Sequence, residues 1–189
     1  TANSGEELEA FIRAMPDHVV VVIDEAYIEY LENPPDLKPL IREGKHLICL
    51  RTFSKIHGLA ALRVGYGYAS PELCALLERV RQPFNVNAIG QAAALAALDD
   101  DEFVSNCRRL NDEGLAALET ELANRRIDFV RSSANFVLAR VGDGMACFSR
   151  LQRRGIIVRP MAPYGLQEWI RITVGNQAEN EAFLKALGE

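Results

Sequence analysis

An uninterrupted apolar run that stops at two acidic residues constrains the fold more than any other feature of this chain. Residues 19–23 are all valine or isoleucine, and Asp24 and Glu25 follow directly. A strand with one solvent-exposed face would alternate apolar and polar residues, whereas a strand covered on both faces is apolar throughout. The run therefore predicts a strand over residues 18–23 in a parallel sheet that is covered on both faces.

The rest of the first half alternates strand and helix patterns. Ser4 and Glu7 form the sequence pattern of a capping box at the start of a helix. Further strands are predicted at residues 47–50 and 64–69, and helices at residues 5–14, 72–80 and 88–98. This order is typical of an α/β unit.

A long helix at about 101–125, with an interruption expected near Gly114, separates this half from a different pattern. Short strands are predicted at residues 127–130, 135–141, 156–158 and 169–174, with helices at 145–154 and 177–187. We therefore expect an α/β part over residues 1–103 followed by a smaller α+β part over residues 104–189.

Composition excludes several classes of protein. A chain of 189 residues can bury about 70% of its unfolded surface, so it needs no metal or disulfide to form a core. The net charge of −5 predicts no broad basic face for nucleic acid. The longest apolar run, residues 92–98, is too short to span a bilayer. Four scattered cysteines without a C-x-x-C pair predict buried thiols and no metal site, and the absence of a secretory signal favours the cytoplasm.

Polar side chains follow the two buried strands where each one ends. Asp24 closes the first, Ser54 and Lys55 follow the second, and Arg63 comes eight positions after Lys55. Ligands of open α/β sheets bind outside the carboxyl ends of parallel strands. Taken singly, Asp24 could be a helix cap or a loop residue, and Lys55 a surface lysine.

Together, an acid, a hydroxyl and two cations suit an anionic ligand with a basic ring nitrogen, and pyridoxal 5'-phosphate is such a ligand. A lysine amine forms its Schiff base. A carboxylate keeps the ring nitrogen protonated, and the planar fork of Arg63 suits its phosphate.

Two longer segments carry a family resemblance. Asp24-Glu25-Ala26-Tyr27 and the pattern S-K-x-x-G-L-A-x-L-R-x-G-Y over residues 54–66 resemble the fold-type I aminotransferases, most closely the histidinol-phosphate aminotransferase family. Residues 169–175 resemble its C-terminal arginine motif, and residues 135–136 and 155–159 also fit. Ala61 departs from the glycine that is common there, and we expect His57 to have a packing role.

The resemblance implies a fold and a set of site residues. Residues 1–103 would be part of the large cofactor domain, comprising the end of its sheet, and residues 104–189 the small C-terminal α+β domain. Lys55 would be the catalytic residue. Cofactor contacts would come from Asp24 at the pyridine nitrogen, Tyr27 at the phenolic oxygen, and Thr52, Ser54 and Arg63 at the phosphate. Arg171 and Arg159 would bind the anionic end of the substrate.

The implied activity is transamination between histidinol phosphate and 2-oxoglutarate in histidine biosynthesis, with glutamate as the amino donor and a homodimer as the full-length form. The alternatives are an aromatic-amino-acid aminotransferase, a threonine-phosphate decarboxylase, or a non-catalytic regulator domain that binds pyridoxal phosphate. In this family a long segment precedes the part that resembles this chain. We therefore expect the 189 residues alone to bind the cofactor weakly and not to turn over.

Overall fold

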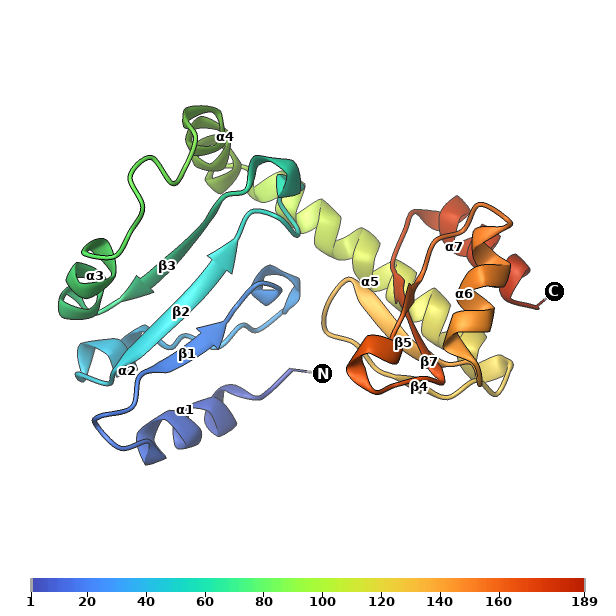
Figure 1. Cartoon of the computed structure of the whole chain (residues 1–189), viewed down its shortest axis with the longest axis horizontal. Coiled ribbons are helices and arrows are strands. Elements are labelled where there is room, and N and C mark those ends of the chain that lie inside the picture. Colours follow the sequence, from blue (N-terminus) through green and yellow to red (C-terminus); the bar gives the residue numbers. More distant parts are fainter. Residues whose placement is uncertain (1, 189) are drawn as a thin grey trace. The chain divides into compact units, whose positions relative to one another are not determined.

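The structure, a computed structural model, describes residues 2–188 (Figure 1). It contains two compact units, Ala2–Ser105 and residues 106–188.

The first unit contains a three-stranded sheet in the order β1-β2-β3. Its strands are β1 (Val21–Asp24), β2 (Leu47–Thr52) and β3 (Gly65–Ala69). β1 and β2 are parallel, with Asp24 opposite Leu50, whereas β3 runs antiparallel to β2. The parallel pairing predicted for the first apolar run is confirmed.

Helices α1 and α4 form over their predicted bounds, and a side-chain cap begins each of them. At the start of α1, the Glu7 amide donates to Ser4 Oγ (3.1 Å) and the Ser4 amide donates to Glu7 Oε2 (2.9 Å). At the start of α4, the Gly90 amide donates to Asn87 Oδ1 (2.7 Å). The helices of this unit are α1 (Gly5–Ala14), α2 (Lys38–Arg42), α3 (Pro71–Glu78) and α4 (Ala88–Leu98), with short 3₁₀ helices at Ile28–Tyr30 and Ala60–Leu62.

One face of the sheet is packed and the other is open. On the packed face, α1 and α2 lie against the strands (Figure 1) and contribute Ile12 and Leu40 to a core with Leu47 and Cys49. On the other face, Ile48 is buried, but the exposed fractions are 53% for Val22 and 42% for Leu50, so much of this face is open.

The prediction that both faces are covered is therefore wrong for the part of the chain that the structure describes, because its helices shield only one face. The first strand also starts later than predicted. The Val19 amide donates to the Pro16 carbonyl (2.9 Å) in a turn, and sheet pairing begins at Val21.

The second unit contains an antiparallel sheet in the order β4-β5-β7-β6, packed on one face by helices. Its elements are the C-terminal part of α5 (Asp101–Asn124), β4 (Phe129–Val130), β5 (Phe136–Arg140), α6 (Gly144–Gln152), β6 (Arg159–Pro160), β7 (Trp169–Thr173) and α7 (Gln177–Gly188), with a 3₁₀ helix at Ala162–Tyr164. Val137, Ile170 and Ile172 face the core with Leu118 of α5 and Phe183 of α7. The alternation along β5 and β7 therefore turns every second side chain away from the helices.

Two local predictions in this unit are corrected. No strand forms over residues 156–158, because the Ile156 amide bonds back to the Leu151 carbonyl of α6 (3.0 Å) after a turn at Gly155. Helix α5 is not interrupted at Gly114. A Cβ at this glycine would lie 2.5 Å from Val174 Cγ1, so close packing accounts for the glycine.

Candidate functional site

Two candidate residues, Asp24 and Thr52, lie on the same face of the first sheet. Asp24 is opposite Leu50, and Thr52 comes two residues later on β2, so the two-residue period of a strand puts their side chains on one side. Asp24 is exposed, and its Oδ1 accepts a hydrogen bond from the Ala26 amide (3.0 Å). The carboxylate therefore stands at the carboxyl end of β1, where ligands of α/β sheets bind.

Lys55 lies on a loop between β2 and β3 that backbone hydrogen bonds close at both ends. The Phe53 amide donates to the Val64 carbonyl (3.1 Å), and the Leu59 amide donates to the Phe53 carbonyl (2.9 Å). Phe53 and Val64 are both buried beneath this loop. These hydrogen bonds and the buried side chains fix the backbone of the loop that carries Lys55.

The structure brings Lys55 and Tyr27 together. The Lys55 Nζ atom lies 5.0 Å from the centre of the Tyr27 ring. Tyr27 directly precedes the 3₁₀ helix that follows β1. Tyr27 follows β1 and Lys55 follows β2, so the ends of these two neighbouring strands bring the side chains close together.

Ser54 and Arg63, the remaining candidates of this unit, form a second group with Thr52. The Ser54 amide donates to Thr52 Oγ1 (3.1 Å), and Arg63 Nη1 donates to Ser54 Oγ (3.4 Å) and to the Ala60 carbonyl (2.8 Å). Within residues 2–188, neither Arg63 nor Lys55 forms an ion pair with a carboxylate. The Thr52 hydroxyl donates to the Val64 carbonyl (3.5 Å). Two cations and the Ser54 hydroxyl, without a neutralising acid, are a donor set that suits an anion.

The backbone of Arg63 is strained. Its φ of +57° and ψ of +48° lie in the left-handed region, which a residue with a side chain rarely adopts. Such strain costs on the order of 1–3 kcal/mol and is common at ligand-binding sites. Here the strained backbone directs the guanidinium toward Ser54.

In the second unit, Arg159 and Arg171 are directly opposite each other on β6 and β7. Arg171 lies on the face of β7 that points away from the helical core. Its guanidinium stacks on the Phe136 ring at 4.9 Å, and its buried Nε has no hydrogen-bond partner. Arg159 donates to the Tyr164 hydroxyl (2.9 Å).

Two contacts with arginine side chains were not predicted from the sequence. The buried carboxylate of Glu25 and the aromatic platform of Phe136 both contact arginines, at Arg51 and Arg171 respectively. Neither pairing has a local sequence signal, because each joins residues that are far apart in the chain.

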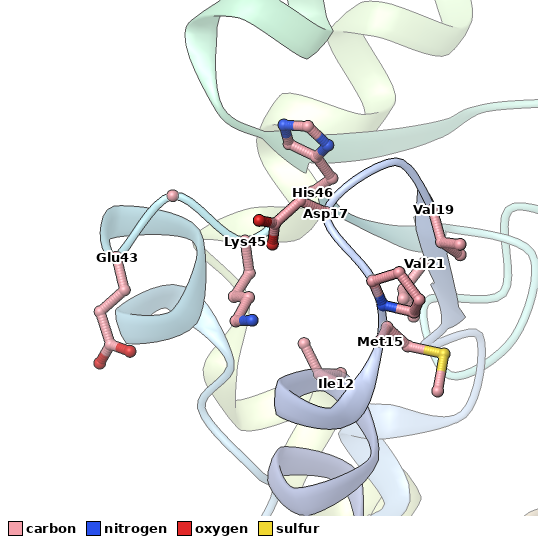
Figure 2. Close-up of a pocket in the computed structure, with 10 residues that line it drawn as sticks. Ile12, Met15, Asp17, Val19, Val21, Glu43, Lys45 and His46 are labelled. Atoms are coloured by element: carbon pink, nitrogen blue, oxygen red, sulfur yellow. The ribbon is translucent and has the colours of Figure 1, made fainter.

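A cavity of about 410 Å³ lies at the other end of the first sheet (Figure 2). Val21 begins β1 and His46 directly precedes β2, so this cavity is remote from the strand ends that carry Asp24 and Lys55. It is lined by Ile12, Met15, Pro16, Asp17, Val19, Val21, Glu43, Gly44, Lys45 and His46. None of the candidate site residues is among them.

Residues 2–188 hold neither a group of metal ligands nor a membrane-spanning helix. In this range no three side chains of the metal-binding types His, Cys, Asp and Glu are grouped so that they could hold an ion. No helix in the same range has the length and apolar character needed to cross a bilayer.

Comparison with known proteins decides the family. The family model described as aminotransferase class I and II matches residues 1–187. This chain belongs to the class I and II aminotransferases. Members of the family depend on pyridoxal 5'-phosphate, which agrees with the cofactor expected from the residues.

Individual relatives and solved structures agree with this family. The chain is 45% identical over 184 residues to a histidinol-phosphate aminotransferase of Akkermansia muciniphila, covering 97% of this chain and 51% of that protein. A putative histidinol-phosphate aminotransferase of Erwinia carotovora atroseptica superimposes with a TM-score of 0.90 at 28% identity, covering 100% of this chain and 55% of that one. The enzyme of Sinorhizobium meliloti, solved in complex with pyridoxal-5'-phosphate, gives a TM-score of 0.87 at 31% identity, with coverages of 97% and 51%.

The α/β fold is thus that of the class I and II aminotransferases. The chain spans about half the length of the curated relatives that it matches.

Proposed function

We propose that this chain carries the lysine and most of the cofactor contacts of an enzyme that transfers an amino group between histidinol phosphate and 2-oxoglutarate. The observation that carries this proposal is that two side-chain groups, Lys55 with Tyr27 and Ser54 with Arg63, follow the carboxyl ends of a parallel strand pair. The names of the relatives support histidinol phosphate as one of the two substrates.

The donor set fits pyridoxal phosphate. Lys55 would supply the amine that bonds to it, and Asp24 would hold a proton on its ring nitrogen. Tyr27 would donate to its phenolic oxygen, and Ser54 and Arg63 would bind its phosphate, with Thr52 orienting Ser54. When bound, the cofactor supplies an electron sink for the bond at the substrate α-carbon. Lys55 would then move a proton between that carbon and the cofactor.

The opposed arginines would recognise the substrate. Two like charges at directly opposite positions of a sheet destabilise it, and a bound anion would relieve the repulsion. Arg171, stacked on Phe136, has an Nε that lacks a hydrogen-bond partner. We assign the anionic end of the substrate to Arg171, with Arg159 as the second cation that a phosphate dianion requires.

The alternatives differ in whether the substrate carries a phosphate and whether an amino group is transferred. An aromatic-amino-acid aminotransferase would need one arginine for a carboxylate, and a threonine-phosphate decarboxylase would release carbon dioxide. A regulator domain would bind the cofactor without turnover. The arginine pair favours a substrate with a phosphate group.

Steady-state kinetics with an active enzyme that contains these residues separates the alternatives. Replacement of Arg159 by Ala should raise KM for histidinol phosphate far more than KM for phenylalanine, because only the first substrate has a phosphate. Equal changes would support the aromatic enzyme instead. Carbon dioxide release, or cofactor binding without transfer of nitrogen from glutamate, would contradict the proposal.

Three further expectations belong to the proposal. We expect the active form to be a homodimer in the cytoplasm. Residues 1–103 would belong to the large cofactor domain and residues 104–189 to the small domain. Because Asp24 and Arg63 are exposed in this chain, we expect the 189 residues alone to hold the cofactor weakly.

A further inference from the structure

A buried carboxylate that the proposed function does not use lies between two of the cofactor contacts. Glu25 follows Asp24 and comes two residues before Tyr27, and its side chain is only 2% exposed. Charged side chains are rarely buried to this extent unless partners compensate the loss of water.

The partners of Glu25 come from the two other strands of the sheet. Arg51 Nε on β2 donates to Glu25 Oε2 (2.7 Å), and the Tyr68 hydroxyl on β3 donates to the same carboxylate (3.0 Å to Oε2). The Arg51 guanidinium also lies 5.6 Å from the centre of the Tyr68 ring. Three neighbouring strands are thus joined through one carboxylate.

The backbone of Glu25 is held as well as its side chain. Its amide donates to the Leu50 carbonyl (2.8 Å), and its carbonyl accepts from the Ile28 amide (3.0 Å). These two bonds attach the segment after β1 to the next strand and to the 3₁₀ helix that begins at Ile28. Glu25 is therefore fixed where the chain leaves the sheet.

Alternation along the chain turns Asp24 and Glu25 to opposite sides. Cys49 and Arg51 lie on the face that α1 and α2 cover, and Tyr68, the partner of Cys49 in the sheet register, packs there too. Glu25 reaches this packed face through Arg51 and Tyr68, whereas Asp24 shares the open face with Thr52. The contacts of Glu25 on the packed face can therefore fix the direction in which the Asp24 carboxylate points on the open face.

We propose that Glu25 is a positioning residue that acts through Arg51 and Tyr68 to fix the segment carrying Asp24 and Tyr27. This inference rests on the proposed function, in which those two side chains contact pyridoxal phosphate. Glu25 itself touches neither cofactor nor substrate. Its role is to hold two contacts in place before the cofactor arrives, so that binding need not order them.

The first test measures positioning without cofactor, by amide hydrogen exchange in the 189-residue chain. The variants are Glu25→Gln, Tyr68→Phe and a control, Glu43→Gln, which makes the same chemical change in the exposed ion pair with Arg13. Glu25→Gln should speed exchange at Ala26 and Ile28 about tenfold or more relative to Val21 at the other end of β1, whereas Glu43→Gln should leave the ratio unchanged.

The second test measures the dissociation constant of pyridoxal phosphate from its absorbance change. Glu25→Gln should raise it by about tenfold or more, as loss of outer partners does for metal ligands. Lys55→Ala should lack the absorbance band that the unmodified chain gives. A band of equal intensity in Lys55→Ala would count against the proposed function, while the exchange test would still decide whether Glu25 positions its segment. Glu25→Gln leaves Arg51 without its charge partner and could unfold the chain. In that case Tyr68→Phe, which keeps the ion pair, is used for both tests. It should change exchange and affinity in the same direction but by less.

The outcomes are distinct. A folded Glu25→Gln chain with unchanged exchange at Ala26 and Ile28 would overturn the proposal, as would an equal rise at Val21, which indicates a general loss of stability. If that variant unfolds, wild-type exchange and affinity in Tyr68→Phe would overturn it. Selective loosening together with weaker cofactor binding would support it.

Discussion

Arg159 and Arg171 are directly opposite each other on adjacent strands, and neither forms an ion pair within residues 2–188. Sheets normally avoid like charges at this position, and Arg140 of the same sheet pairs with Glu168 (2.9 Å). We therefore expect this uncompensated pair to bind an anion.

Inorganic phosphate should bind to this pair. In an NMR titration, amide signals of β6 and β7 should shift in a saturable way, and Arg159→Ala should weaken the binding by about tenfold, the effect of losing one charge-assisted contact. Arg140→Ala, which removes an ion-paired arginine of the same sheet, is the matched control. Identical titrations for the two variants would contradict a specific anion site.

Arg63→Gly should separate cofactor binding from stability. Glycine relieves the left-handed backbone at φ +57°, which offsets the lost bond to the Ala60 carbonyl, so we expect the free energy of unfolding to change by less than ~1 kcal/mol. The affinity for pyridoxal phosphate should fall by about tenfold or more because a phosphate contact is lost.

Arg126 provides the control for this substitution, because it is an arginine with φ +55° that is not among the cofactor contacts. Arg126→Gly should relieve similar strain and leave cofactor affinity unchanged. If both variants bound pyridoxal phosphate as well as the parent chain does, Arg63 would have no role at the phosphate.

Gly65→Ala should destabilise the strand pair that supports the lysine loop. A Cβ at Gly65 would lie 2.8 Å from the Arg51 carbonyl oxygen, which is backbone and cannot easily move. We expect a loss of ~1–3 kcal/mol in urea unfolding. Gly5→Ala, whose Cβ would make an ordinary 3.4 Å contact with Pro35, should not destabilise the chain, and equal losses would show that the close approach is not limiting.

Cys49 should be unreactive in the folded chain. Burial is the largest of the effects that raise the pKa of its thiol to about 11, so the nucleophilic thiolate is scarce at pH 8. Since the folded pKa lies above the ordinary value of 9.0, this group stabilises the fold fully below pH 9.0 and loses its contribution as pH rises through about 11. Iodoacetamide at pH 8, followed by peptide mapping, should label the half-exposed Cys74 before Cys49; equal labelling would argue against burial of Cys49.

The sequence predicted best the features that are decided locally. Helices α1 and α4 match their predicted bounds because Ser4 and Asn87 cap them within three residues. The parallel pairing of β1 and β2 followed from the apolar run, because such runs suit buried parallel strands. The loop from Ser54 to Arg63 was found from its residue pattern.

Features that depend on distant residues could not be predicted. The openness of the sheet face at Val22 depends on which segments cover it, and no pattern within β1 contains that information. Glu25 bonds to residues 26 and 43 positions later, so its sequence neighbours do not reveal its partners. The two-residue strand β6 was misplaced because two residues give too short a pattern to fix a register.

The most direct test of the proposed function is to find where pyridoxal phosphate attaches to this chain. The 189-residue chain is incubated with the cofactor, reduced with borohydride to make the bond permanent, digested and mapped by mass spectrometry. We expect one dominant modified peptide, with the label on Lys55, and loss of that label in Lys55→Ala but not in Lys45→Ala. Labelling spread over surface lysines, or unchanged in Lys55→Ala, would contradict it.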